Sequence, residues 1–466
     1  MKTKKIIALT LSLAMVLGVV AACNQTNESD ASAASDASEA TTAAPDASDA
    51  TTAAPESQAP EAQVSEFTEL TVADVSDEGD GVLVYGWNDE FPGLVAKYSQ
   101  VDIGDPVLTE SNSYQAKLDQ VLDSGEDAPD LFVCDADYAS KYMNSDNTLP
   151  INDLGISYDE LSEMYNYTLQ FATDNDNVIK GLAWQACPCG VFYNRTLAET
   201  YLGTQDPDEL AAKFATWDAF LESAREVNTA SNGEVKIVSG LDDVWRAYLN
   251  TREQGWIVDG ELYIDPVMED YFDMAKALYD EDLTFQTSQW GDAWNANMAN
   301  ESVVTYWGPM WLLNFCMGFQ DGSNPTKGDW GITTAPGNFF WGGTWMMAST
   351  YCDMKASVAQ IMRDIAIDEA NLQDMAEGGE FVNNISIMTA LAQDDSFGVE
   401  NLGGQNPLPA LLAAATTIDN STVGENDQAI NDAFNTIVNS YVQGDIASVP
   451  DAETQFEAAL EEAGII

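Results

Sequence analysis

Histidine is absent from the 466-residue chain, and basic residues are scarce, with 17 lysines and arginines against 77 aspartates and glutamates. Without histidine the chain cannot form Ser-His-Asp or Cys-His nucleophile systems, nor any metal site that uses a histidine ligand. The formal net charge of −60 argues against nucleic acid as a partner, because phosphate binding requires basic patches. It favours a neutral or cationic ligand over an anionic one. Solubility is an alternative explanation of the acidity.

Cysteine is also scarce, and its spacing excludes the common zinc motifs. Of the six cysteines, one lies near the N-terminus and no two have the CxxC spacing of zinc sites. The other five are Cys134, Cys187, Cys189, Cys316 and Cys352. Cys187 and Cys189 are separated only by Pro188, which is too tight for an easy disulfide. We therefore expect buried free thiols, and neither a metal nor a cofactor.

The first 22 residues are typical of a secretory signal peptide. Lysines at positions 2, 4 and 5 precede an apolar run over 6–20, which is too short to span a membrane. Small residues then lead to Cys23, an order similar to the lipobox of bacterial lipoproteins. This resemblance implies that Cys23 becomes the lipidated N-terminus after cleavage. The alternative is a plain secreted protein in which Cys23 has no role. Removal of the three lysines leaves 14 basic and 77 acidic residues, a formal charge of −63.

Residues 23–66 are expected to form a disordered acidic linker. The stretch is built mainly from Ala, Ser, Thr, Asp, Glu and Pro, has no aromatic residue before Phe67, and repeats TTAAP at 41–45 and 51–55. Such a composition cannot bury enough apolar area to fold. A coil of this length would reach roughly 35–40 Å on average. The folded part is then 67–466, and because a single core stops growing near 250–300 residues, two lobes are expected.

Strand-like and helix-like segments alternate at the start of the folded part. Apolar strands are predicted over 82–86 and 131–134, with helices over 91–98 and 113–122. This alternation predicts α/β layers with a largely parallel sheet. In open α/β sheets ligands bind beyond the carboxyl ends of the strands. The polar or aromatic residues there are Trp87, Asn88, Glu90, Asp135 and Asp137. Helix capping is an equally good explanation of each acidic or amide residue among them.

Tryptophan is concentrated between Gln289 and Trp345, which hold seven of the twelve in the chain. Trp307 and Trp311 flank a Gly-Pro pair, and Trp341 and Trp345 flank a Gly-Gly pair. Aromatic rings beside such turns lie at the ends of elements, where pockets form. An indole face suits the C–H face of a sugar ring, although packing in the core is the alternative for each ring. We expect two or three of the seven to contact a ligand.

Six stretches, in this order, resemble the family 1 extracellular solute-binding proteins of bacterial ABC importers, the carbohydrate-binding group. They are 84–91 (VYGWNDEF), 129–132 (PDLF), 190–195 (GVFYNR), 216–220 (TWDAF), 303–311 (VVTYWGPMW) and 341–345 (WGGTW). Each stretch alone is weak, whereas the six in order are specific to the family and not to a ligand. The sequence departs from the family in two places. The family often has Lys or Arg just after the first strand, whereas the first basic residue after that strand is Lys97, and Cys187-Pro188-Cys189 is unusual at the crossing.

The resemblance implies an α/β, two-lobe, periplasmic-binding-protein type II-like fold with discontinuous lobes and a hinge. The first lobe would hold about 80–186 and 302–341, and the second about 187–301 and 342–466. The chain would cross between lobes near 185–190, 297–303 and 341–344. A ligand would lie between the lobes and close them by hinge motion.

The resemblance also implies a ligand set and a function. The implied ligand-binding residues are Trp87, Asn88, Glu90, Asp135, Asp137, Trp184, Gln185, Trp307, Trp311, Trp341 and Trp345, with Trp290 and Trp294 less secure. The expected protein is a monomer, not an enzyme, lipid-anchored at the extracellular face of a Gram-positive cell membrane. It would capture a small-molecule carbohydrate and deliver it to ABC transporter permease subunits. The number of tryptophans near turns favours an oligosaccharide.

Three other functions remain open from the sequence. The acidity would also suit a non-sugar solute such as a polyamine or a peptide. A secreted glycoside hydrolase needs only two carboxylates, and 77 acidic residues leave room for such a pair, although no catalytic motif is recognisable. A structural or adhesive lipoprotein is the third alternative.

Overall fold

The computed structural model describes residues 66–319 and 322–466. The predicted signal peptide, the lipidation site Cys23 and all but the last residue of the predicted linker lie outside these residues. The chain divides into two units, 1–57 and 58–466, and every described residue belongs to the second. None of the helices within the described ranges is long and apolar enough to cross a membrane.

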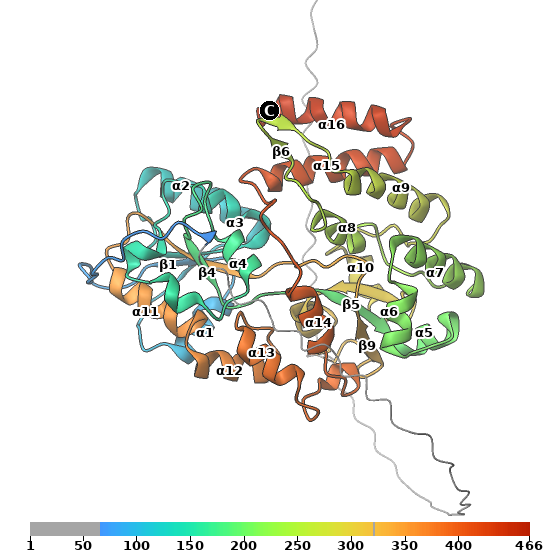
Figure 1. The fold of residues 1–466 in the computed structure, drawn as a ribbon, viewed down its shortest axis with the longest axis horizontal. Helices are drawn as coiled ribbons and strands as arrows, with labels where there is room; N and C mark the ends of the chain where they lie inside the picture. The colour runs from blue at the N-terminus through green and yellow to red at the C-terminus, as the bar shows by residue number, and fades with distance from the viewer. Residues whose placement is uncertain (1–65, 320–321) are drawn as a thin grey trace, which may run out of the picture. The chain divides into compact units, whose positions relative to one another are not determined.

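A five-stranded sheet forms the centre of the first half of the fold (Figure 1). Its order is β2 (Val107–Leu108), β1 (Val84–Gly86), β3 (Leu131–Asp135), β10 (Thr344–Ala348) and β4 (Gly181–Ala183). β1 pairs in parallel with β2 and β3, whereas β10 is antiparallel to β3 and β4. The prediction of a largely parallel sheet is therefore only half right. β10 arrives from the other sheet through residues 334–343 and is antiparallel to both of its neighbours.

Helices surround this sheet and complete what we call the first lobe, residues 66–183 and 344–377. They are α1 (Glu90–Tyr98), α2 (Ser111–Ser124), α3 (Ala136–Met143), α4 (Asn166–Phe171), α11 (Lys355–Ala366) and α12 (Glu369–Glu377), with short helices η2 (Ile151–Leu154) and η3 (Tyr158–Leu161). The predicted helices over 91–98 and 113–122 correspond to α1 and α2. In Figure 1 this lobe occupies the left side.

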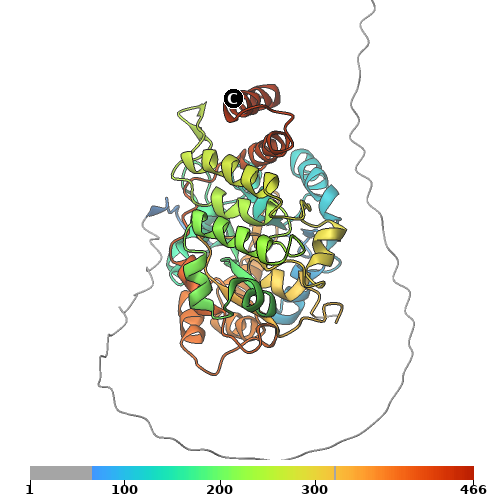
Figure 2. The same cartoon turned by 90° about the vertical axis from the view of Figure 1, so that its right-hand side faces the viewer.

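A three-stranded antiparallel sheet forms the centre of the second lobe, residues 190–333 and 408–466. Its order is β8 (Thr305–Gly308), β5 (Gly190–Asn194) and β9 (Trp330–Thr333). The helices are α5 (Arg195–Leu202), α6 (Pro207–Lys213), α7 (Trp217–Ala230), α8 (Asp242–Leu249), α9 (Pro266–Asp280), α10 (Asp292–Asn297), α14 (Leu408–Ala415), α15 (Asp427–Val442) and α16 (Val449–Ala463). A hairpin, β6 (Ile257–Val258) and β7 (Glu261–Leu262), and η4 (Leu312–Cys316) also belong here. Figure 2 shows the green helices of this lobe grouped together.

Two segments carry the chain between the sheets in opposite directions. Residues 184–189 lead from β4 in the first sheet to β5 in the second, and 334–343 lead from β9 back to β10. The predicted crossings near 185–190 and 341–344 agree with these segments. The predicted crossing near 297–303 is wrong, because Val303 and Val304 stay in the second lobe, where they pair with Lys236.

The predicted division of the chain between lobes is wrong in its later half. Residues 302–341 were expected in the first lobe, but β8 and β9 both pair with β5 of the second sheet. Residues from 342 onward were expected in the second lobe. β10 lies inside the first sheet instead, whereas α14, α15 and α16 do pack within the second lobe. The assignment failed because the local sequence pattern shows that a segment is a strand but not which strand it pairs with. That pairing depends on residues far away in the chain.

The local signals in the sequence did specify individual elements. Thr216 caps α7, accepting a hydrogen bond at its side chain from the backbone N–H of Ala219 (3.2 Å). Phe220, Ala224 and Val227 lie on one face of α7 and are buried. Gly464 ends α16 in the left-handed conformation, which glycine adopts without steric cost. The amphipathic pattern, the cap and the stop residue together explain why these helices form where they do.

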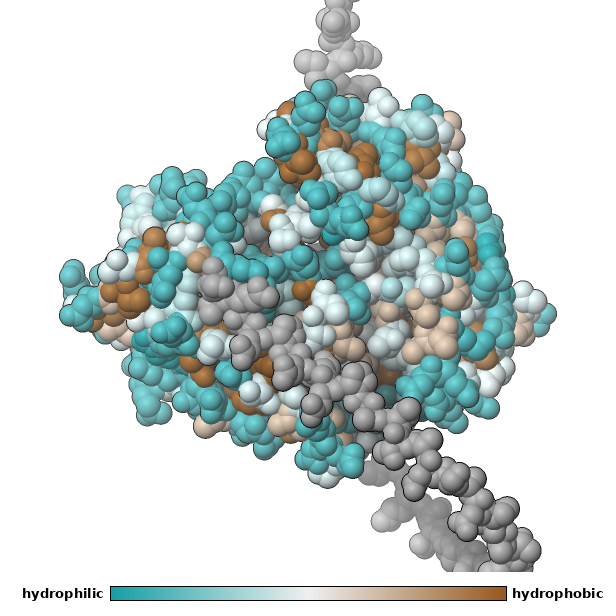
Figure 3. Space-filling model, viewed as in Figure 1, coloured by the Kyte–Doolittle hydropathy of each residue, from teal (hydrophilic) through white to brown (hydrophobic). Residues whose placement is uncertain are grey.

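The five cysteines within the described residues are free thiols, as the sequence predicted. Cys134, Cys187, Cys189 and Cys352 are buried, and Cys316 is partly buried. The molecular surface in Figure 3 is mostly hydrophilic, with small hydrophobic groups separated from one another. Such a surface is consistent with the large excess of acidic residues.

Candidate functional site

The carboxyl ends of β1 and β3 meet at one edge of the first sheet. The two strands are parallel neighbours, with Val84 opposite Leu131, so the segments that follow them lie side by side. Asn88 accepts a hydrogen bond from the backbone N–H of Glu90 (3.1 Å). Asp135 caps α3 by accepting from the backbone N–H of Asp137 (2.9 Å). The capping role is therefore real for Asp135, and it positions the carboxylate at the boundary between the lobes.

Two glutamates from distant parts of the chain approach each other near the first crossing. Glu90 begins α1, and Glu380 follows α12. Gln185, in the crossing segment, donates a hydrogen bond from Nε2 to Glu380 (3.1 Å). Burial, followed by the negative charge of Glu90, raises the pKa of Glu380 to about 7. Burial and Asp89 raise the pKa of Glu90. No cation is among the causes of either shift, so these two carboxylates lie in an acidic, poorly solvated position.

Three tryptophans form an aromatic cluster beside the second crossing, which we call the tryptophan cluster (Trp290, Trp311 and Trp341). The rings of Trp290 and Trp311 are nearly parallel, at 15° with centroids 6.0 Å apart. The Trp341 ring meets Trp311 at 67° and 4.7 Å, and Trp290 at 56° and 5.6 Å. Trp290 is 57% exposed, Trp311 is partly buried and Trp341 is 4% exposed. The cluster therefore offers an aromatic surface to solvent on one side.

The backbone holds this cluster in place by specific contacts. Trp311 Nε1 donates to the backbone carbonyl of Trp341 (3.0 Å). Gly342 has φ +70°, and a Cβ there would come within 3.1 Å of Trp311 Nε1, so only glycine allows this approach. Trp290 itself has φ +66°, an uncommon conformation for a bulky residue that is often associated with function. The Gly-Gly turn noted in the sequence thus serves to bring the two indoles together.

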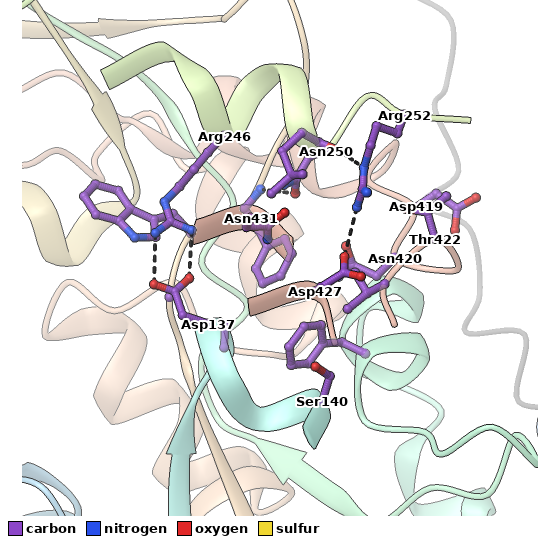
Figure 4. Close-up of a pocket in the computed structure, with 17 residues that line it drawn as sticks. Asp137, Ser140, Arg246, Asn250, Arg252, Asp419, Asn420, Thr422, Asp427 and Asn431 are labelled. Atoms are coloured by element: carbon purple, nitrogen blue, oxygen red, sulfur yellow. Dashed lines mark hydrogen bonds and ion pairs between the residues drawn. The ribbon is translucent and has the colours of Figure 1, made fainter. Parts of the chain in front are cut away.

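An ion pair joins the two lobes next to the tryptophan cluster. Arg246 on α8 donates from its two terminal nitrogens to Asp137 on α3, at 2.7 and 2.9 Å, as Figure 4 shows. The Arg246 guanidinium also lies 5.0 Å from the centroid of the Trp341 ring. Burial and Asp137 raise the pKa of Asp135, and Arg246 partly offsets that rise. Asp135, Asp137, Arg246 and Trp341 therefore form one connected group at the boundary between the lobes.

A small cavity lies against this group. Its volume is about 50 Å³, far below the roughly 300–1,000 Å³ of a typical ligand pocket, so it does not hold a sugar ring by itself. Figure 4 shows a second ion pair on its wall, in which Arg252 donates to Asp427 (3.0 Å). Both side chains of that pair are buried, and both belong to the second lobe. This pair connects the segment after α8 to the start of α15.

Three of the predicted ligand tryptophans are core residues. Each is only 1% exposed: Trp184, Trp307 and Trp345. Trp184 stacks on Phe91 at 5.9 Å, and Trp345 packs 4.5 Å from Phe171. Trp307 donates from Nε1 to the hydroxyl of Thr305 (3.1 Å). The structure gives none of these rings a surface that a ligand could contact, so the packing alternative applies to all three.

Trp87 and Trp294 are also held by contacts within the protein. Trp87 is partly buried and packs edge-on against Tyr114 and Tyr138, so it supports the strand ends rather than joining the tryptophan cluster. Trp294 is buried and donates from Nε1 to Asp243 (2.7 Å). The residues that the fold does gather are Glu90, Asp135, Asp137, Gln185, Trp311 and Trp341.

Sequence reasoning missed Arg246 and Glu380, and it gave Trp290 little weight. Arg246 is one of only five arginines in a strongly acidic chain, which was the available signal. Glu380 follows a Gly-Gly pair after α12, and nothing in its neighbourhood distinguishes it from the other glutamates. Among the described residues no group of three or more acidic or cysteine side chains could hold a metal ion.

Comparison with known protein families decides the class of the protein. The family model described as bacterial extracellular solute-binding protein matches residues 66–350, which is more than half of the chain. The chain belongs to this family. A comparison with curated protein sequences found no match.

Solved structures share the fold of this solute-binding protein at low sequence identity. An extracellular solute-binding protein of family 1 has a TM-score of 0.70 at 19% identity, covering 81% of this chain and 99% of that chain. The galacto-N-biose-/lacto-N-biose I-binding protein from Bifidobacterium longum, in complex with lacto-N-biose, gives 0.64 at 15%, covering 84% and 99%. An ABC transporter associated binding protein from B. animalis subsp. lactis Bl-04, with beta-1,6-galactobiose, gives 0.61 at 19%, covering 82% and 96%. The predicted two-lobe α/β fold is thus confirmed.

Proposed function

We propose that this protein captures a carbohydrate, and more narrowly an oligosaccharide, between its two lobes and delivers it to the permease of an ABC importer. One observation carries the proposal: the tryptophan cluster lies at the boundary between the lobes together with Asp135, Asp137 and Gln185. Indole faces bind the apolar faces of sugar rings, while carboxylates and amides pair with hydroxyl groups. The carbohydrates bound by the structural neighbours, such as lacto-N-biose and beta-1,6-galactobiose, support the same class of ligand.

The proposal includes the place of the protein in the cell. A leader that ends in Cys23 and a long polar linker would tether a solute-binding protein to the outer face of the cell membrane through a lipid. A solute bound there between hinged lobes would be presented to a permease in the closed state. We propose a monomer that performs no chemistry on its ligand.

A second candidate is a cationic solute such as a polyamine. It is favoured by Glu90 and Glu380, which lie near each other without a cation to offset their charge. Aromatic rings beside carboxylates are also a known arrangement for organic cations. The two candidates differ in the charge of the ligand and can be separated directly.

The test is a ligand screen by thermal melting and intrinsic tryptophan emission. The panel contains maltotetraose, lacto-N-biose, beta-1,6-galactobiose, their constituent monosaccharides and spermidine. A ligand present at about 100 times its dissociation constant stabilises the folded state by about 2.7 kcal/mol, so binding will raise the melting midpoint. We expect a response to an oligosaccharide and a weaker one to its monosaccharides.

The matched pair of variants is Trp311→Ala and Trp217→Ala. Both side chains are partly buried tryptophans of the second lobe, but Trp217 packs on Tyr248 (3.8 Å between ring centroids), away from the tryptophan cluster. We expect the response to disappear in the first variant and to persist in the second. Equal responses to monosaccharide and oligosaccharide would contradict the oligosaccharide proposal, and a response to spermidine alone would favour the second candidate.

A further inference from the structure

Arg246 places a cation of the protein itself where the aromatic and acidic residues meet. It extends from α8 in the second lobe, and two of its nitrogens bind Asp137 of the first lobe at 2.7 and 2.9 Å. Its guanidinium lies 5.0 Å from the centroid of the Trp341 ring, within the distance at which a cation is attracted to an aromatic face. The guanidinium therefore occupies a position that the charged group of a cationic solute would otherwise take (Figure 4).

Four carboxylates interact with this cation. Asp137 binds it directly. Asp135 at the end of β3, Asp242 on α8 and Asp432 on α15 interact with Arg246 electrostatically. Burial alone would lower the pKa of Arg246, but the nearby acidic groups, Asp137 foremost and Asp135 after it, together raise the pKa. The guanidinium is therefore charged in place. If a neutral residue replaced Arg246, four carboxylates and an indole face would remain without this counter-charge, an arrangement that favours an organic cation.

One hydrogen-bond donor of Arg246 stays unused. Its Nε is buried and has no hydrogen-bond partner among the described residues, whereas the two terminal nitrogens are engaged by Asp137. A buried N–H without a partner is costly. A hydroxyl oxygen of a neutral solute could accept from it, but an ammonium group could not, because an ammonium group has no acceptor.

We propose that Arg246 is a specificity-determining residue, which occupies the cation position at the boundary between the lobes so that the site accepts neutral saccharides and rejects polyamines. The inference rests on the proposed function, because it defines which chemical class the solute site excludes.

The experiment measures spermidine binding by thermal melting in the wild-type protein and three variants. Arg246→Gln removes the cation, and Arg246→Lys keeps it. Arg225→Gln is the matched control, since Arg225 is paired with Glu222 and Glu281 within the second lobe and its replacement changes the net charge equally. The difference between Arg225→Gln and the wild type shows how much of any change in spermidine binding follows from net charge alone. Arg246→Met replaces Arg246→Gln if the latter does not fold.

We expect the melting midpoint of Arg246→Gln to reach half of its maximal shift at a spermidine concentration about tenfold lower than that of the wild type. Tenfold corresponds to the free energy of one additional cation–π contact. Arg246→Lys and Arg225→Gln should behave as the wild type does. The inference is overturned if Arg246→Gln folds and binds spermidine no more tightly than the wild type does. The outcome is independent of the saccharide screen: silence of the wild type toward saccharides would contradict the proposed function while a spermidine gain in Arg246→Gln would still support the role of Arg246.

Discussion

Replacement of Glu380 by glutamine is expected to stabilise the protein at alkaline pH and to leave its stability at acidic pH unchanged. Glu380 is partly buried, and burial together with the charge of Glu90 raises its pKa from 4.5 to about 7. A carboxyl with a raised pKa contributes stability below pH 4.5, where it is protonated in both states, and loses that contribution as the pH rises through 7. The full loss amounts to about 3 kcal/mol, at about 1.36 kcal/mol per pKa unit.

Glutamine keeps the shape of the side chain and an oxygen that can accept from Gln185, while it removes the charge. At pH 8 the melting midpoint of Glu380→Gln should exceed that of the wild type by several degrees, because about 1 kcal/mol shifts the midpoint of a 150–250-residue domain by about 2–4 °C. At pH 4 the two proteins should melt together. The control is Glu377→Gln, an exposed residue at the end of α12 that loses the same charge. The reasoning is refuted if both variants gain equally at pH 8, or if Glu380→Gln gains as much at pH 4.

Three further outcomes are expected. Arg252→Gln should cost about 3–5 kcal/mol in unfolding free energy by denaturant titration, because it leaves Asp427 as a buried charge without its partner; a cost below that of an exposed pair, about 1 kcal/mol, would contradict this. Thr216→Ala should cost about 1 kcal/mol in the same titration, through loss of the α7 cap, and an unchanged midpoint would disprove that role. Arg246→Gln should increase the radius of gyration of the ligand-free protein in small-angle X-ray scattering, because the ion pair of Arg246 with Asp137 joins the lobes. The control Arg225→Gln should leave the radius unchanged. Equal radii for both variants would contradict the bridging role.

Local features of the sequence were sufficient to predict the strands and helices at the start of the folded part. The apolar runs at 82–86 and 131–134 became β1 and β3, and the polar residues after them lie at one sheet edge because the two strands are parallel. The crossing at 184–189 agrees with the crossing near 185–190 that the family resemblance implied. The division of the chain between the lobes could not be predicted from the sequence. β8, β9 and β10 each have the pattern of a buried strand, and no local feature shows which strand each one pairs with.

The candidate site was predictable where side chains follow strand ends and turns. Asp135, Asp137, Trp311 and Trp341 meet there because the fold brings those ends together. Trp184, Trp307 and Trp345 have the same residue type and similar turn neighbours, yet their rings point into the core, since side-chain direction depends on register within the sheet. Composition could not separate these two groups of tryptophan. Arg246 was missed because its importance arises only from the approach of α8 to α3.

The central claim is that a neutral saccharide binds between the lobes on the tryptophan cluster. The most direct test is a crystal structure of the protein with the saccharide that gives the largest thermal shift in the screen. We predict sugar density between the lobes, with a ring in van der Waals contact with Trp290 or Trp311 and hydroxyl groups within hydrogen-bond distance of Asp135 or Gln185. Sugar density away from the boundary between the lobes, or a boundary that stays empty at saturating saccharide, would contradict it.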